Sequence, residues 1–106
     1  MQGRYLGCAL ALAVAVLPAR AVEGDAEAAK GKISMCIGCH GIDGYRTSFP
    51  EVYPVPKLGG QYPEYIIAAL QAYKAGERNH PTMQGVAGGL SEQDMADLAA
   101  YYSAAR

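Results

Sequence analysis

Apolar residues follow two different patterns along this chain. They run almost without interruption from residue 5 to residue 17. Farther on, in segments 63–75 and 91–104, they recur every three or four positions, which is the spacing of one helix face. Segment 25–38 places acidic residues first and lysines later, the order that a helix dipole favours. We therefore predict three main helices, near 25–38, 63–75 and 91–104.

Local signals mark the ends of two of these helices. Pro63 stands at a first helical position, and Gly76 follows the apolar pattern as a C-terminal cap. Ser91 and Asp94 form a capping box at the start of the last helix. Segments 41–61 and 77–90 are rich in glycine and proline, and we predict loops there.

The stretch 52–56 (VYPVP) has β-type residues, but its prolines argue against a strand, so the predicted fold class is all-α. Loops as long as 41–61 are unusual in a compact domain unless they enclose something. We therefore expect three main helices whose long loops wrap around a central group.

The apolar N-terminal run has the three-part plan of a secretory signal peptide. Arg4 precedes it, Pro18 ends it, and residues 19–21 form an A-x-A cleavage site. The alternative is a membrane anchor, but the run is shorter than the roughly 20 apolar residues that a spanning helix needs. We predict a signal peptide 1–21 cleaved after Ala21, export to the periplasm without a stable membrane span, and a single domain over 22–106.

Cleavage would change both the charge and the cysteine content. It removes two arginines, which leaves seven basic and ten acidic side chains and a net charge of −3, a balance that argues against nucleic-acid binding. It also removes Cys8 and leaves Cys36 and Cys39. The remaining 85 residues bury a small core, which is marginal without a staple, metal or cofactor. A disulfide across so short a loop would add little stability.

Residues 36–40 read CIGCH and allow three interpretations. A structural zinc site needs four ligands, and His80 is the one suitable partner left. A redox dithiol of the thioredoxin type should begin a helix that follows a strand, and no such pattern is present. The third interpretation is covalent haem attachment through C-x-x-C-H, which puts two thioethers one helical turn apart and an imidazole beneath the iron. We favour haem, which would also supply the missing core.

A six-coordinate haem iron needs a second axial ligand besides His40. Met95 lies on the apolar stripe of the last helix and Met35 precedes the first cysteine, so we expect both to be packing residues. Met83 lies in a polar loop with no obvious core to fill, and we favour it as the ligand. His80 is the alternative, although it could equally be an exposed loop histidine.

With these features the chain resembles a class I c-type cytochrome. The likeness is to small single-haem bacterial cytochromes of the c553/c5 kind, or to one half of a dihaem cytochrome c4. It rests on CIGCHG (36–41), PKLGGQ (56–61), the helix 62–78, Met83, and LSEQDMADLAAYY (90–102). The resemblance implies the cytochrome c fold around one covalently attached haem c.

The resemblance also implies roles for single residues. Cys36 and Cys39 would hold the haem, and His40 and Met83 would be its axial ligands. The backbone carbonyl of Pro56 would accept a hydrogen bond from the far nitrogen of His40 and so fix the orientation of the ring.

Three more positions match the family near the haem or its propionates, namely Gln61, Tyr65 and Arg78. One position departs from it: family members have a glycine before the first cysteine where the terminal helices cross. Here Ala28 and Ala29 stand in that region, so we expect a looser crossing.

The function that follows is electron transfer by a periplasmic carrier with redox partner proteins, rather than enzymatic catalysis. The alternative is a haem c subunit bound permanently within a larger oxidoreductase, and a third hypothesis is ligand binding or catalysis at an open iron. No residue pattern indicates hydrolysis, and we expect Asp94 and Asp97 to form a solvated helix face.

Overall fold

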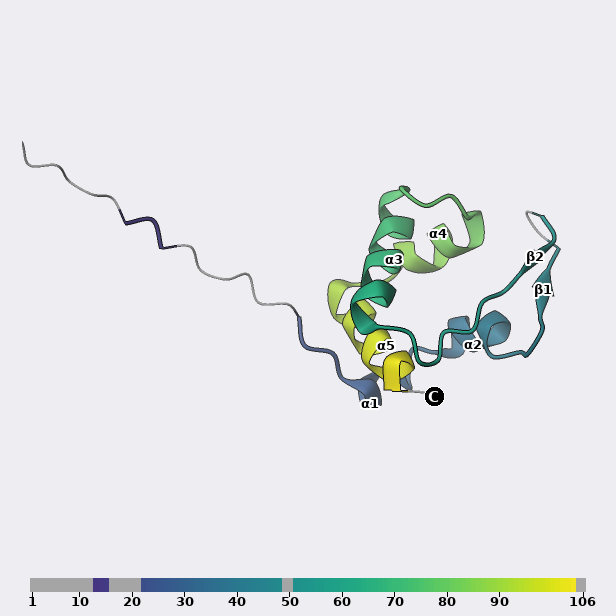
Figure 1. Cartoon of the computed structure of the whole chain (residues 1–106), viewed down its shortest axis with the longest axis horizontal. Helices are drawn as coiled ribbons and strands as arrows, with labels where there is room; N and C mark the ends of the chain where they lie inside the picture. The colour runs from purple at the N-terminus through teal and green to yellow at the C-terminus, as the bar shows by residue number, and fades with distance from the viewer. Residues whose placement is uncertain (1–12, 16–21, 49–50, 105–106) are drawn as a thin grey trace, which may run out of the picture.

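The computed structural model describes residues 13–15, 22–48 and 51–104. The elements of this part, shown in Figure 1, are α1 (Ala26–Ala29), α2 (Ser34–His40), β1 (Arg46–Thr47), β2 (Tyr53–Pro54), α3 (Pro63–Ala75), α4 (Pro81–Gly88) and α5 (Glu92–Ala104). Apart from residues 13–15, the predicted signal peptide and its cleavage site lie outside the described residues. Within the described part, no helix is both long and apolar enough to cross a bilayer.

Helices α3 and α5 confirm the two predictions that rest on local signals. Pro63 is the first residue of α3, and Gly76 caps its end with a left-handed φ of 78°. At the start of α5 the capping box is reciprocal, since Ser91 N–H donates to Asp94 Oδ2 at 2.9 Å and Asp94 N–H donates to Ser91 Oγ at 3.0 Å. These contacts satisfy donors that a helix cannot satisfy within itself.

The prediction of one helix over 25–38 is wrong, because turns at residues 30–33 divide the segment into α1 and α2. Asp25 caps α1 by accepting from the N–H groups of Glu27 and Ala28. The chain then turns at Gly31 and re-enters a helix at Ser34. The division places the cysteine motif on a helix of its own, apart from α1.

The prediction of a loop over 77–90 is also wrong, because residues Pro81–Gly88 form α4. Met83, Val86, Ala87 and Leu90 have helical spacing, and glycines between them hide the pattern. A short strand pair likewise replaces the expected irregular segment, with Thr47 opposite Tyr53 and Arg46 opposite Pro54. Proline is tolerated here because both strands are edges, where an N–H is not required.

The core lies where α1 and α3 pack against α5. Its α5 residues include Met95, Leu98 and Ala99, all at most 2% exposed. Met95 is therefore a packing residue, as predicted. Gly24, just before α1, touches the α5 backbone so closely that an added Cβ would lie 2.1 Å from the carbonyl oxygen of Ala96. The expectation of a looser crossing is wrong, because Gly24 supplies the close approach.

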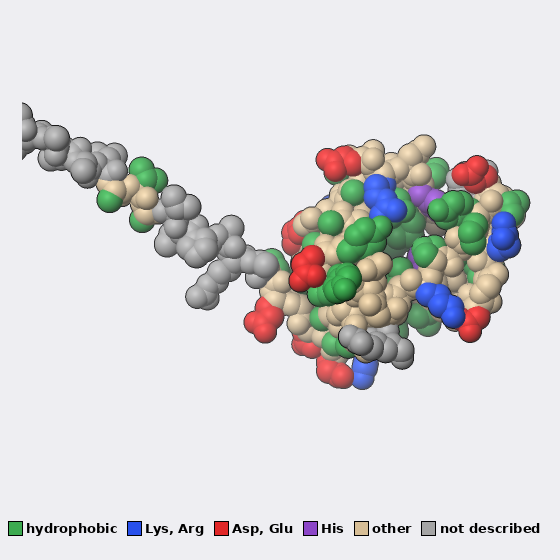
Figure 2. Space-filling model, viewed as in Figure 1, with side chains coloured by type: hydrophobic (Ala, Val, Ile, Leu, Met, Phe, Trp, Pro, Cys, Tyr) green, Lys and Arg blue, Asp and Glu red, His purple; other side chains and the backbone are tan. Residues whose placement is uncertain are grey.

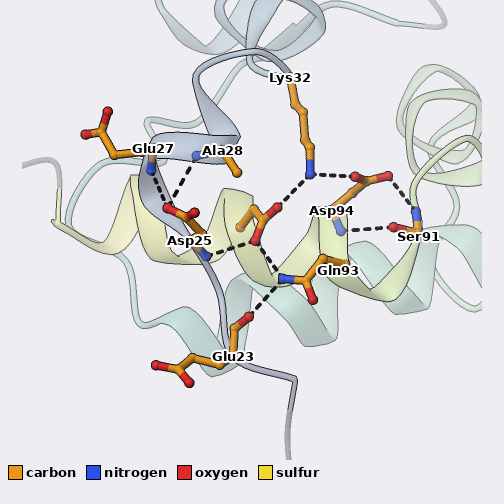
Figure 3. A network of polar contacts seen from close by, with 9 residues as sticks. Glu23, Asp25, Glu27, Ala28, Lys32, Ser91, Gln93 and Asp94 are labelled. Carbon is orange, nitrogen blue, oxygen red and sulfur yellow. Dashed lines mark hydrogen bonds and ion pairs between the residues drawn. The ribbon is translucent and has the colours of Figure 1, made fainter.

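A polar network ties the N-terminal segment to α5 (Figure 3). Asp97, only 2% exposed, accepts from Asp25 N–H at 2.8 Å, from Gln93 Nε2 at 2.8 Å and from Lys32 Nζ at 2.6 Å. Lys32 also pairs with Asp94 at 2.7 Å. The prediction that Asp94 and Asp97 form a solvated face is therefore wrong, because Lys32 covers both carboxylates. These contacts fix the start of the domain over its last helix.

Candidate functional site

A single cavity of about 290 Å³ gathers the predicted site residues. Its wall is built by α2, the segment around β2 and Pro56, α3, α4 and one face of α5. All eight residues proposed from the sequence line it: Cys36, Cys39, His40, Pro56, Gln61, Tyr65, Arg78 and Met83. Figure 2 shows a hollow with green apolar side chains around it and purple histidine side chains inside. The wall is largely apolar, with aliphatic side chains that include Leu58, Ile66, Leu70, Val86, Leu90 and Leu98.

Helix α2 presents the cysteine motif to this cavity. Cys36 and Cys39 are both free thiols, and their spacing puts them one turn apart on the same helix face. Cys36 is buried, and burial raises the pKa of its thiol against an opposing effect of the Tyr102 hydroxyl. A redox-active thiol needs a lowered pKa instead. The burial of Cys36 thus speaks against disulfide exchange at this thiol.

The interpretation of the motif as part of a zinc site also finds no support in the geometry. Among the described residues, no three or more His, Cys, Asp or Glu side chains come together as a metal-binding group. The histidine of the motif, His40, is held by one contact: its Nδ1 lies 2.7 Å from the carbonyl oxygen of Pro56. With a proton on Nδ1, the ring donates to that oxygen and keeps Nε2 free as a ligand atom.

Met83 faces the cavity from α4, a separate part of the wall. Its own N–H is bound by the side chain of His80, which caps the helix. His80 also lines the cavity and is partly buried, so it is not an exposed loop histidine. Met35 lines the cavity too but is 49% exposed, which contradicts the prediction that it is a packing residue. Its place in the first turn of α2, outside the core, explains the difference.

The three further predicted residues lie at the exposed side of the same wall. Gln61 accepts from the N–H of Tyr62 at 2.9 Å through Oε1, and Tyr65 is 53% exposed. The guanidinium of Arg78 lies 4.6 Å from the ring centroid of Tyr73. Their exposure would let them meet the polar edge of a bound group, while the apolar part of the wall would contact its interior.

Two wall residues, Tyr73 and Tyr102, were not predicted as part of the site. Both stand on apolar helix stripes, so their sequence signal was that of the core. Tyr102 is 9% exposed, and its hydroxyl is buried without a hydrogen-bond partner among the described residues. Burial, with neighbouring Cys36, raises its pKa to about 12. The hydroxyl lies beside the Cys36 thiol at the cavity wall.

A haem fits this donor set. The thiols can form thioethers, the imidazole and the methionine sulfur are its established axial donors, and the aliphatic wall suits the porphyrin faces. None of these groups is used elsewhere in a disulfide or an ion pair within the described part of the chain.

Comparison with known proteins gives the same answer. The sequence profile of the family "Cytochrome c" matches residues 26–104. The chain is 43% identical over 83 residues to cytochrome c-554(548) of Halomonas halodenitrificans, with 76% of this chain and 95% of that protein covered. It is 42% identical to cytochrome c4 of Stutzerimonas stutzeri, again over 76% of this chain but only 40% of the relative.

The solved structures agree. The structure of reduced cytochrome c4 from Pseudomonas stutzeri superposes with a TM-score of 0.62 at 40% identity, covering 78% of this chain and 46% of that one. The chain thus spans about half or less of the length of the c4 proteins and nearly all of the c-554(548) protein. Its fold is the cytochrome c fold, and the haem c that this fold binds covalently is its cofactor. The chain belongs to the cytochrome c family.

Proposed function

We propose that this protein is a periplasmic carrier of single electrons, with haem c attached through Cys36 and Cys39 and ligated by His40 and Met83. Family membership supports electron transfer in general. The observation that carries the finer proposal is that two free thiols, an imidazole and a thioether converge on one largely apolar cavity. When bound, the haem supplies an iron that changes between its ferric and ferrous states.

The residues around the cavity would set the properties of that iron. His40 is oriented by the Pro56 carbonyl, so the ring is ordered before any change of oxidation state. Methionine as the second ligand raises the reduction potential, and an aliphatic wall favours the less charged ferrous form. With both axial positions filled, little has to move when an electron enters or leaves.

The test is the weak sulfur-to-iron charge-transfer band at the red end of the ferric spectrum. We expect this band in the wild-type protein and its loss in Met83→Ala, together with a lower reduction potential. Met35→Ala is the matched control, because Met35 also lines the cavity and should leave the band unchanged. A Met83→Ala protein that keeps both the band and the potential would refute this ligation.

The cellular part of the proposal needs its own measurement. We expect the haem protein in the periplasmic fraction, with a mature chain that begins at Val22. A protein that stays with the membrane fraction and retains residues 1–21 would contradict the proposed cleavage.

A second candidate is a subunit bound permanently to a dehydrogenase. Its support is a 36% identity over 67 residues to a protein named as the cytochrome subunit of sulfide dehydrogenase, of Chlorobaculum tepidum. A free carrier should elute from a periplasmic extract at the size of this chain alone, at both low and high salt. Elution at the size of a larger complex that survives high salt would favour the subunit.

A further inference from the structure

The first turn of α4 contains an unusual helix cap. His80 precedes the helix in an extended conformation (φ −153°, ψ 104°), and its Nδ1 accepts from the N–H of Met83 at 3.3 Å. Ser, Thr, Asp and Asn are the usual caps. The residue held by this cap is the same one that carries the thioether into the cavity, so the cap acts directly on the backbone of Met83.

The imidazole of His80 is itself held in place by α3. Its ring meets the ring of Tyr73 edge to face, with the centroids 6.5 Å apart and an interplanar angle of 79°. The guanidinium of Arg78 lies 4.6 Å from the centroid of the same Tyr73 ring. Tyr73, Arg78 and His80 all line the cavity with Met83.

Backbone contacts hold the segment between the two helices as well. The N–H groups of Glu77 and Arg78 both donate to the carbonyl of Ala72, at 2.9 and 3.2 Å, around the left-handed Gly76. The path from the end of α3 to Met83 is therefore fixed at the backbone by Ala72 and at the side chains by Tyr73. Along this path, the hydrogen bond from Met83 N–H to the His80 ring is the contact that holds the methionine itself.

We propose that His80 is a positioning residue for the axial methionine: Tyr73 holds the imidazole, and the imidazole holds the Met83 backbone, which would keep the sulfur on the iron. The proposal rests on the proposed ligation by Met83. Two contacts of His80 carry it, the hydrogen bond to Met83 and the ring contact with Tyr73, and substitutions can separate them. Asn retains a capping oxygen without the ring, Phe retains the ring without an acceptor, and Ala retains neither.

The experiment titrates ferric holoprotein with imidazole at about pH 8, where free imidazole is neutral and competes with methionine for the iron. We expect His80→Ala to bind imidazole about fivefold more tightly than wild type, which is the fold-change for a lost cap of about 1 kcal/mol. His80→Phe should behave like His80→Ala, and His80→Asn should return to within about twofold of wild type. The sulfur-to-iron band should weaken in the same order.

Ser91→Ala is the matched control, because it removes the cap of α5 rather than that of α4. It should destabilise the protein without changing the affinity for imidazole. If His80→Ala binds imidazole as wild type does, or if Ser91→Ala tightens binding as much, the positioning role is overturned. If His80→Ala fails to mature, the contrast between His80→Asn and His80→Phe decides, and equal affinities overturn the proposal.

Failure of the ligation itself would look different. Met83→Ala should abolish the sulfur-to-iron band and increase imidazole affinity far more than any His80 variant does. A wild-type protein without the band, or a Met83→Ala protein with unchanged imidazole affinity, would overturn both proposals. A normal Met83→Ala response with a wild-type His80→Ala response overturns the role of His80 alone.

Discussion

Gly24 makes the closest backbone approach in the helix crossing and gives the sharpest stability test. A Cβ at this position would lie 2.1 Å from the carbonyl oxygen of Ala96, 2.6 Å from its carbonyl carbon and 3.1 Å from the Cβ of Ala100. Real Cβ atoms essentially never come closer than 3.0 Å to another heavy atom, so Gly24→Ala must move one backbone segment by about 1 Å. The first two obstructing atoms are backbone, which cannot rotate away.

The structure bounds the size of the effect. Moving the N-terminal segment outward would stretch Asp25 N–H to Asp97 and Gln93 to the Glu23 carbonyl, each 2.8 Å long. Overpacking of this kind costs about 1–3 kcal/mol, and a glycine-to-alanine change recovers about 0.4–1 kcal/mol by restricting the unfolded chain. We therefore expect a net loss of about 1–2 kcal/mol of unfolding free energy. For a domain of this size it corresponds to a fall in Tm of roughly 5–15 °C.

The assay is thermal unfolding of the ferric holoprotein followed by circular dichroism. Gly85→Ala is the matched control, because Gly85 lies exposed within α4 and a Cβ there meets nothing within 4 Å. This change should leave Tm unchanged or raise it, because alanine favours a helix over glycine by up to about 1 kcal/mol of unfolding free energy. If Gly24→Ala has the Tm of wild type, or shifts it as Gly85→Ala does, the close crossing at Gly24 is refuted.

Three further predictions test the core and the polar network. Hydrogen bonds from Lys32 and from backbone N–H hold the Asp97 pKa at about 2 against an ordinary 3.8, so its ionised form stabilises the fold above about pH 4 and this contribution disappears as pH falls through about 2. Asp97→Asn should flatten Tm against pH in that range, whereas Asp43→Asn, in an exposed pair, should follow wild type. Leu98→Ala should cost about 2–5 kcal/mol in urea unfolding, because Leu98 is only 2% exposed. Tyr102→Phe should change that free energy by less than about 0.5 kcal/mol, because the hydroxyl lacks a partner; a loss above about 1 kcal/mol would show that it binds another group in the holoprotein.

Helix ends could be predicted from the sequence where the signal is local. The ends of α3 depend on Pro63 and Gly76, and the start of α5 depends on Ser91 with Asp94, all within four residues of the helix they mark. Helix α4 was not predicted, because its local signals are mixed. Its cap is a histidine and its apolar stripe is interrupted by glycines, and these features outweighed Pro81, which stands at the first helical position as Pro63 does in α3. Packing against α3 accompanies the helix that forms.

Contacts between distant parts of the chain could not be predicted in this way. Lys32 and Asp97 are 65 residues apart, and the sequence around either residue contains no signal that predicts this ion pair. The glycine at the helix crossing was sought within the first helix, but Gly24 lies before α1 in extended chain and approaches α5 from there. The eight residues proposed from the sequence all line the cavity; five of them belong to two short motifs, and the resemblance supplied the rest.

The packing of the helices indicates what the cofactor does for the fold. Helices α1 and α3 pack on α5 and α4 packs on α3, whereas α2, within the described part of the chain, has no comparable packing partner. Two contacts link it to the rest: Cys36 belongs to the buried apolar cluster, and His40 contacts the Pro56 carbonyl. A haem held to α2 by Cys36 and Cys39 and bound from α4 by Met83 would join these two parts of the cavity wall. The binding free energy of the cofactor would then become folding free energy, so the proposed donor set would also complete the core.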